Sequence, residues 1–383
     1  MDKPVNQNSA IVAPDMTLVM LTLGLLLVGL VASTSASIVY AELHFENPWF
    51  HGVRHFVYLL MGIIAAVATY YVKPQFWFST GWWWLFGALL LLILVLIPGI
   101  GHEAKGASRW LPVGPLTLQP SEFAKLAMVV YLAGYMVRRE HEVRNQWQGF
   151  LKPMTVLFAT TLLLMKEPDF GATVIVSATA LGMLFLAGVR LGHFMLVVLG
   201  ALAALLVLVI SEPYRLARLT SYTDPWADPY GSGFQLVQSL IAFGRGEWFG
   251  VGLGNSVQKL FYLPEAHTDF VFSIWAEETG FVGAIALIAL FVALIGRILW
   301  VGRRAFVNDN AFGAYISYGV ALIFSGQAFI NMGVSSGLLP TKGLTLPFGS
   351  YGGSSLIVCC VMLGLVVRID HDSRLVPARR RLA

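Results

Sequence analysis

The sequence of 383 residues has little charge and almost no cysteine. Charged side chains make up 12% of it, whereas roughly 25% is usual, which excludes an ordinary soluble domain. The two cysteines, Cys359 and Cys360, are neighbours in an apolar segment. Adjacent cysteines on a helix rarely pair with each other, so neither a disulfide framework nor a cysteine metal site is expected. The net charge is +4, and the basic residues lie mainly in short segments between apolar runs. This distribution is typical of membrane topology and does not indicate nucleic-acid binding.

Hydrophobic side chains account for 57% of the chain, and many form runs of about 20 residues, the length that a helix needs to cross a bilayer. We therefore expect an all-α polytopic membrane protein with a single integral membrane domain over residues 1–383. Residues 1–15 are polar and no cleavage site follows the first apolar run in the usual place, so that run is expected to remain as the first span. The ten predicted spans are 16–40, 54–72, 82–98, 121–137, 151–166, 170–189, 193–211, 270–298, 311–331 and 351–369.

Ten spans place both termini on one side of the membrane. Most of the 25 Lys and Arg residues fall on that side, and positively charged loops are typical of the cytoplasmic side, so cytoplasmic termini are expected. The longest outer loop runs over about 212–269, between the seventh and eighth spans. Its segment from Phe234 to Phe243 has an amphipathic pattern that predicts a helix, one that could lie in the outer membrane interface.

The end of this loop gathers His267, Asp269, Glu277 and Glu278 where a span begins. Carboxylates near a bilayer are costly to hold and are therefore candidate functional groups. Asp269 has three possible roles: a general base, a ligand of a divalent cation such as Mg²⁺ or Mn²⁺, or a cap of the following helix. In the second role, Glu265, Glu277 or Glu278 would help to bind the cation. His267 is either a local hydrogen-bond partner or a proton shuttle.

A second cluster lies between Gly106 and the start of the fourth span. Glu122 and Lys125 are three residues apart, so they share a helix face and can form a structural ion pair. Alternatively, Lys125 and Arg109 face an anionic ligand, because arginine suits bidentate contact with phosphate and lysine acts as a point charge.

Two further clusters are rich in turn-forming residues. Lys166-Glu167-Pro168-Asp169 is a charged turn, and Asp169 is its candidate binding residue. The glycines and prolines between Asn331 and Ser355 forbid a continuous helix, so this segment is either a plain re-entrant turn or the lining of a cavity that includes Lys342 and Ser350. All four clusters fall on the outer side in the ten-span arrangement. Basic groups and carboxylates there indicate an amphiphilic ligand with an anionic head, such as a phospholipid or a polyprenyl pyrophosphate.

Four segments together resemble the SEDS family (shape, elongation, division and sporulation proteins), and the resemblance covers nearly the whole chain. They are GASRWLPVGPLTLQPSEFAK at 106–125, EPDFG at 167–171, GLGNSVQKLFYLPEAHTDFVFSIWAEETG at 252–280 and NMGVSSGLLPTKGLTLPFGSYGGSSL at 331–356. The resemblance implies a bacterial inner-membrane peptidoglycan glycosyltransferase that polymerises lipid II at the division septum. It also implies a class B penicillin-binding protein of the FtsI type as a partner, other divisome proteins of the FtsQ, FtsL, FtsB and FtsN types, and contact with membrane lipid.

The resemblance also implies roles for individual residues. Asp269 matches the family's essential aspartate, so it is expected to activate the acceptor hydroxyl, directly or with a metal, while undecaprenyl pyrophosphate leaves. Arg109, Glu122 and Lys125 match charged positions of the family. The expected substrate-binding residues are Arg109, Glu122, Lys125, Asp169, Arg215, Arg218, His267, Lys342 and Ser350.

Two other functions remain open on the sequence alone. A lipid II flippase would use the same charged residues to carry the head group across the membrane, and it requires a polar path through both leaflets. A non-catalytic divisome scaffold would recruit the penicillin-binding protein and would tolerate loss of Asp269. The position of all four clusters on the outer side favours the enzyme.

Overall fold

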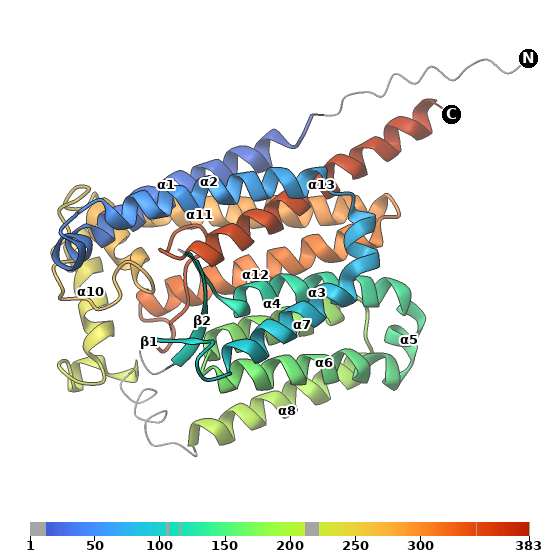
Figure 1. The fold of residues 1–383 in the computed structure, drawn as a ribbon, viewed down its shortest axis with the longest axis horizontal. Coiled ribbons are helices and arrows are strands. Elements are labelled where there is room, and N and C mark those ends of the chain that lie inside the picture. Colours follow the sequence, from blue (N-terminus) through green and yellow to red (C-terminus); the bar gives the residue numbers. More distant parts are fainter. Residues whose placement is uncertain (1–12, 105–106, 115, 211–221, 342, 383) are drawn as a thin grey trace, which may run out of the picture.

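The computed structural model describes residues 13–104, 107–114, 116–210, 222–341 and 343–382. Long helices that run side by side dominate this part of the chain (Figure 1). They are α1 (Met16–Phe45), α2 (Phe50–Tyr71), α3 (Pro74–Val95), α4 (Pro120–Arg138), α6 (Trp147–Lys166), α7 (Phe170–Leu186), α8 (Leu191–Ile210), α11 (Val271–Val307), α12 (Ala311–Ser335) and α13 (Gly353–Leu382). Shorter elements are α5 (Glu140–Asn145), the 3-10 helix η1 (Pro225–Ala227) and α10 (Phe234–Gly246).

Each predicted span coincides with one of the long helices. Among the described residues, seven helices are long and apolar enough to cross a membrane: α1, α2, α3, α6, α11, α12 and α13. Helices α4, α7 and α8 form at the other three predicted positions. The chain is therefore a multi-pass membrane protein with a helical fold, as predicted.

Some helix boundaries differ from the prediction. Helix α3 begins at Pro74, before the predicted start at 82, because proline is well suited to the first turn of a helix. Helix α11 continues to Val307, beyond the predicted end at 298. Charged side chains in its last turns end the apolar run but do not end the helix.

A small antiparallel sheet is an element that the all-α prediction did not include. Strands β1 (His102–Ala104), β2 (Ala107–Val113) and β3 (Leu116–Leu118) are paired in the order β1-β2-β3. Leu111 pairs with Leu118 and Val113 with Leu116, on either side of Gly114. Gly114 has a φ of +61°, a conformation that glycine adopts without a steric penalty. Strand β2 contacts α3 and α4 and carries Arg109.

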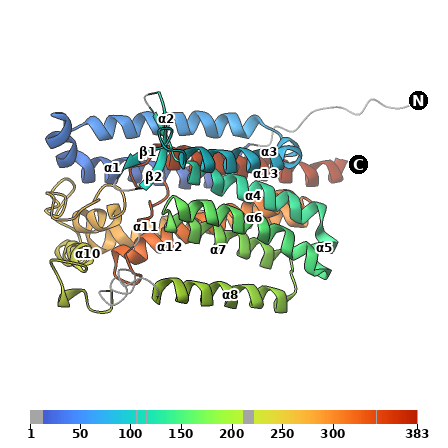
Figure 2. The same ribbon diagram turned by 60° about the horizontal axis from the view of Figure 1, so that its bottom comes forward.

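Helix α11 has a central place in the bundle. It packs against α1, α10 and α12, while α2 lies along α13 and α3 lies along α4. Helices α4 and α12 are buried over most of their length, whereas α8 lies at the edge of the bundle and has few contacts outside α7 (Figures 1 and 2).

The connections alternate between the two ends of the bundle. The sheet, α10 and the first turn of α11 lie at one end, and α5 lies at the other (Figure 1). Helix α1 begins and α13 ends at the α5 end, so both lie on the same side, as ten spans predict. The end with the sheet and α10 is called the site end below.

Candidate active site

Asp269 lies directly before α11, in a tight turn at the site end. The carbonyl oxygen of Glu265, whose φ is +57°, accepts hydrogen bonds from the backbone N–H groups of Thr268, Asp269 and Phe270 at 3.1, 3.0 and 3.3 Å. Helix α11 begins at Val271 with Phe270 as its N-cap residue. The interpretation of Asp269 as the N-cap is therefore wrong, since the helix starts one residue later than the sequence suggests.

The carboxylate of Asp269 packs against the loop between α12 and α13. A Cβ atom placed on Gly343 would lie 2.8 Å from Asp269 Oδ2, so the glycine leaves the space that this carboxylate fills. The loop is held in turn by Asn331 of α12, whose Nδ2 donates to the carbonyl oxygens of Asp269 at 2.8 Å and Leu344 at 2.6 Å. Asn331 is buried and was not singled out from the sequence. The sequence feature that could have indicated Asn331 is its amide side chain within a largely apolar segment.

Ser350 links the same loop to the backbone beside Asp269. Its hydroxyl accepts a hydrogen bond from the N–H of Leu346 at 2.8 Å and donates to the carbonyl oxygen of Thr268. The next residue, Tyr351, donates its N–H to the carbonyl oxygen of His267 at 2.9 Å. In this structure, the predicted binding residue Ser350 is buried and fixes the position of the turn that carries Asp269.

Aromatic and histidine side chains surround His267. Its ring centroid lies 4.9 Å from that of Tyr40, 5.6 Å from that of His51 and 6.1 Å from that of Tyr351. Within the described part of the chain, the ring nitrogens of the buried residues His51 and His55 on α2 have no hydrogen-bond partner. His267 is recognisable as a candidate from the sequence, whereas the two α2 histidines are not, because nothing local in α2 shows that it faces the Asp269 turn.

Glu122 and Lys125 form the ion pair that their spacing allows. Lys125 Nζ lies 2.7 Å from a Glu122 carboxylate oxygen, and the two side chains are 1% and 6% exposed. Each charge of such a buried pair neutralises the other, so removal of either partner would leave an unpaired buried charge and destabilise the protein. The start of α4 is tied to α13 because Ser354 accepts from the N–H of Gln119 at 3.1 Å and donates to the carbonyl oxygen of Thr117 at 2.8 Å.

Arg109 of β2 clamps the turn between α6 and α7. Its Nε donates to the carbonyl oxygen of Glu167 at 3.0 Å, and its Nη2 donates to that of Pro168 at 2.5 Å. Asp169 caps α7 by accepting the N–H of Ala172 at 3.0 Å. Burial raises the pKa of Glu167 to about 8; the neighbouring Asp169 carboxylate adds to this rise and Arg109 opposes it.

This turn also contacts the loop that packs on Asp269. A Cβ atom on Gly171 would lie 2.7 Å from the side chain of Leu344 and 3.0 Å from the carbonyl oxygen of Gly343. The 106–125, 166–171, 263–280 and 331–355 segments are therefore joined by direct contacts at the site end. The prediction that all four clusters lie on one side is confirmed.

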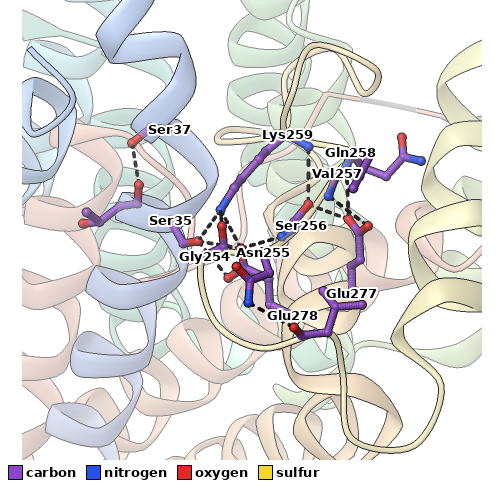
Figure 3. A network of polar contacts seen from close by, with 12 residues as sticks. Ser35, Ser37, Gly254, Asn255, Ser256, Val257, Gln258, Lys259, Glu277 and Glu278 are labelled. Atoms are coloured by element: carbon purple, nitrogen blue, oxygen red, sulfur yellow. Dashed lines mark hydrogen bonds and ion pairs between the residues drawn. The ribbon is translucent and has the colours of Figure 1, made fainter.

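Glu277 and Glu278 hold the outer loop on α11 (Figure 3). Glu278 pairs with Lys259 at 2.9 Å and accepts hydrogen bonds from Ser35 at 2.6 and 2.7 Å. Glu277 accepts from the Ser256 hydroxyl at 2.5 Å and from the N–H of Val257 at 3.1 Å. Both carboxylates are buried in these contacts.

Metal binding by Asp269 with help from Glu265, Glu277 or Glu278 stays a prediction. No group of three or more His, Cys, Asp or Glu side chains suited to a metal ion occurs in the described part of the chain. Three predicted binding residues, Arg215, Arg218 and Lys342, lie outside the described residues.

The chain matches the family model of cell cycle proteins that covers FtsW, RodA and SpoVE over residues 16–375. It belongs to the SEDS family. A SEDS relative from Pseudomonas fluorescens, named "Probable peptidoglycan glycosyltransferase FtsW", is 54% identical over 352 residues, which are 92% of this chain and 86% of the relative. The protein of the same name from Nitrosococcus halophilus is 52% identical over 368 residues, 96% of this chain and 95% of the relative.

Two solved SEDS-like structures share the fold. A chain from a peptidoglycan synthase complex, studied for the coordination of polymerization and crosslinking, has a TM-score of 0.77 and 32% identity. The match covers 94% of this chain and 99% of that chain. The rod shape determining protein RodA of Thermus thermophilus has a TM-score of 0.69 and 28% identity, with 94% of this chain and 98% of RodA covered.

Proposed function

We propose that this SEDS protein is a peptidoglycan glycosyltransferase that polymerises lipid II on the outer face of the bacterial inner membrane, at the division septum. The observation that carries the proposal is the placement of Asp269. Its turn is held by Asn331 and Ser350 from two other segments, and its carboxylate fits against Gly343. Supports of this kind hold a reactive group in one geometry before substrate binds. The names of the relatives supply the reaction class.

The proposed reaction needs one base and one good leaving group. Asp269 accepts the proton of the 4-hydroxyl on the acceptor's terminal GlcNAc as that oxygen attacks the anomeric carbon of the donor MurNAc. The bond from this carbon to the pyrophosphate oxygen breaks, and undecaprenyl pyrophosphate leaves with the electron pair. The acceptor attacks opposite the leaving group, so the configuration at the anomeric carbon inverts. A second carboxylate nucleophile is not required.

Cationic groups at the site end are proposed to stabilise the charge on the leaving pyrophosphate. Arg109 is half-buried and gives only two of its five N–H donors to the turn at Glu167 and Pro168. Lys125 is committed to Glu122, so it is proposed to act through the field of the pair. Arg215, Arg218 and Lys342 remain proposed substrate contacts, as do Asp169 and His267.

Among the described residues, the site offers few carboxylate ligands for a divalent cation. Glu277 and Glu278 are bound to residues of the outer loop and of α1, and Asp269 is the carboxylate that the family resemblance assigns to the reaction. Mg²⁺ commonly uses one or two carboxylates together with substrate phosphates. We therefore propose that any Mg²⁺ or Mn²⁺ is held by Asp269 and the pyrophosphate, where it would neutralise phosphate charge.

The proposed partners rest on the family resemblance and on the similarity to a chain of a peptidoglycan synthase complex. A class B penicillin-binding protein of the FtsI type would cross-link the strands, and FtsQ, FtsL, FtsB and FtsN types would complete the assembly. The proposal places both termini in the cytoplasm, because the α5 end carries most of the basic residues.

The test is polymerisation of labelled lipid II by the purified protein with its cognate class B penicillin-binding protein. Wild type is compared with Asp269→Asn, which keeps the side-chain shape but removes the base. Asp224→Asn is the matched control, since Asp224 lies exposed in the same outer loop and its side chain makes no capping bond. Wild type and Asp224→Asn are expected to form glycan strands, and Asp269→Asn is expected to form none.

Three outcomes would change the proposal. Equal polymerisation by Asp269→Asn would remove Asp269 as the base. Lipid II movement across vesicles by both variants without polymerisation would favour a flippase. Normal recruitment of the penicillin-binding protein with no activity in wild type would favour a scaffold. The same assay with EDTA, followed by Mg²⁺ or Mn²⁺, decides whether a cation is needed.

A further inference from the structure

A basic cavity lies between α11 and α13, at the end of the bundle opposite Asp269. It has a volume of about 390 Å³ and is lined by Arg297, Arg304, Asn308, Ser373 and Arg374. Beyond the kink at Gly280, α11 rises roughly 35 Å from Phe281 to Arg304, at about 1.5 Å per residue. This length is enough to cross the hydrocarbon core of about 30 Å, so the cavity and Asp269 lie at opposite ends of the span.

The arginines that line the cavity form ion pairs with two aspartates, Asp15 and Asp370, that do not line it. Arg297 Nε donates to Asp15 Oδ2 at 2.6 Å, and Arg374 lies 3.2 Å from the same oxygen. Arg304 donates to Asp370 Oδ1 at 2.9 Å, and Arg374 Nε lies 2.7 Å from Asp370 Oδ2. Asp15 and Asp370 are buried and neither lines the cavity. Three arginines and two aspartates carry a net charge of +1, and the positive groups face the cavity.

The arginines keep hydrogen-bonding capacity toward the cavity. Each guanidinium has five N–H donors in a planar fork, and the aspartates accept only one or two from each. The side chains of Arg297, Arg304 and Arg374 are about a quarter exposed. Such forks match the oxygen atoms of phosphate bidentately. The lining is therefore suited to a phosphate-bearing anion.

Trp300 indicates that this anion belongs to a lipid. The residue lies on α11 between two of the lining arginines, with its ring centroid 4.0 Å from the guanidinium carbon of Arg297 and 3.6 Å from that of Arg304. It is 40% exposed, and Leu299 and Phe306 of the same helix are exposed as well. Tryptophan is enriched where a membrane protein meets lipid headgroups. An anion bound here would have apolar protein surface beside it.

We propose that the α11–α13 cavity binds the phosphate headgroup of an anionic phospholipid from the inner leaflet. Basic pockets between transmembrane helices on the cytoplasmic side are suited to cardiolipin and related headgroups. The acyl chains would lie along the exposed apolar face of α11. The inner-leaflet assignment rests on the proposed orientation of the chain, whereas the binding chemistry does not depend on catalysis.

The test is native mass spectrometry of delipidated protein titrated with cardiolipin, phosphatidylglycerol or phosphatidylcholine. Arg304→Gln removes one lining cation, and Asp370 keeps its ion pair with Arg374, so no buried carboxylate is left unpaired. Arg303→Gln is the matched control, because it removes the same charge from an exposed neighbour that does not line the cavity. Asn308→Asp is a second variant that adds a carboxylate to the lining.

Wild type and Arg303→Gln are expected to bind the anionic lipids with equal affinity and phosphatidylcholine weakly. Arg304→Gln is expected to bind anionic lipid about tenfold more weakly, the effect of losing one charge-assisted contact, and Asn308→Asp should weaken it too. Undiminished binding by both folded variants would overturn the proposal. Displacement of the lipid by millimolar inorganic phosphate would identify a soluble anion site and would overturn the lipid assignment. Lipid binding is read without lipid II, so its failure is distinct from failure of polymerisation.

Discussion

At the residue scale, Asn331 is the side chain that most directly connects Asp269 to the rest of the bundle. A single amide group donates to the carbonyl oxygens of Asp269 and Leu344 and so fixes the turn and the facing loop together. Asn331 is a positioning residue, because its contact is to the backbone of the proposed base.

Replacing Asn331 by Asp is expected to lower kcat about tenfold or more while KM changes little. The carboxylate keeps the shape of the amide but places oxygen against two carbonyl oxygens, which repel it. Polymerisation kinetics measure both constants. Asn255→Asp is the control, since Asn255 also donates its amide to a carbonyl, that of Val251, but is exposed. An equal effect of both changes on kcat would contradict a positioning role.

The raised pKa of Glu167 predicts that the stability of the protein depends on pH. Its pKa is about 8 in the folded protein, above its usual value of 4.5, so the folded state holds a proton that the unfolded state has released. Stability therefore falls as pH rises from about 4.5 to about 8 and levels off above that range. The thermal unfolding midpoint in detergent, measured from pH 5 to 9, is expected to show this fall in wild type.

Glu167→Gln mimics the protonated side chain and is expected to flatten the profile. The glutamine removes the proton that links folding to pH but keeps the size of the side chain. Asp228→Asn is a suitable comparison because Asp228 is exposed in the outer loop. Identical slopes for wild type and Glu167→Gln would show that Glu167 does not titrate in this range.

At the element scale, the ends and irregular points of helices build the site, and the kink in α11 is the clearest example. Gly280 has a φ of +71° within α11, and a Cβ atom there would collide with the backbone nitrogen atoms of Phe249 and Gly250. The kink lets the outer loop dock two residues after the Glu277–Glu278 pair. The polar network in Figure 3 therefore depends on a backbone conformation that favours glycine.

Gly280→Ala is expected to destabilise the protein by at least about 2 kcal/mol, because both the φ and the close backbone oppose a side chain. Gly296→Ala on the same helix is the matched control. No atom of the described residues lies within 4 Å of a Cβ atom placed there, so alanine should leave stability unchanged or raise it by about 0.5–1 kcal/mol. Thermal unfolding of both variants measures the difference, and equal midpoints would exclude strain at the kink.

At the scale of the whole molecule, the bundle separates two chemically different ends. Asp269, the sheet and α10 lie at one end, and the α11–α13 cavity and α5 lie at the other. The reaction proposed for the first end uses an extracytoplasmic substrate, whereas the lipid proposed for the second comes from the inner leaflet. The orientation of the chain in the membrane is therefore a testable premise of both.

Cysteine labelling tests this orientation with little background. Cys359 and Cys360 are buried, so a membrane-impermeant maleimide is expected not to label the wild type. Tyr230→Cys, at a position 91% exposed in the outer loop, should be labelled in intact spheroplasts. His141→Cys, in exposed α5, should be labelled only after lysis. The reverse pattern would invert the proposed topology.

Much of the fold could be predicted from local sequence. The length of each apolar run predicts a spanning helix because backbone groups in lipid must be hydrogen-bonded within the segment. The amphipathic pattern at Phe234 predicts α10, which forms over Phe234–Gly246. Ten alternating spans also predict that the four polar clusters share one side. Each of these properties depends on neighbouring residues and on the direction of the chain.

The composition of the site depends on contacts that no local pattern records. His51 of α2 lies near His267, and Asn331 reaches Asp269, only because helices distant in sequence pack together. Glu277 and Glu278 are adjacent to the site in sequence, yet the outer loop takes both carboxylates for its own anchoring. The sequence by itself determined the spans, their order and the side on which charge gathers, because these follow from hydrophobic length. Only the tertiary structure decided which of those charged groups anchor the fold and which belong to the site, because that depends on the partner that each buried group contacts.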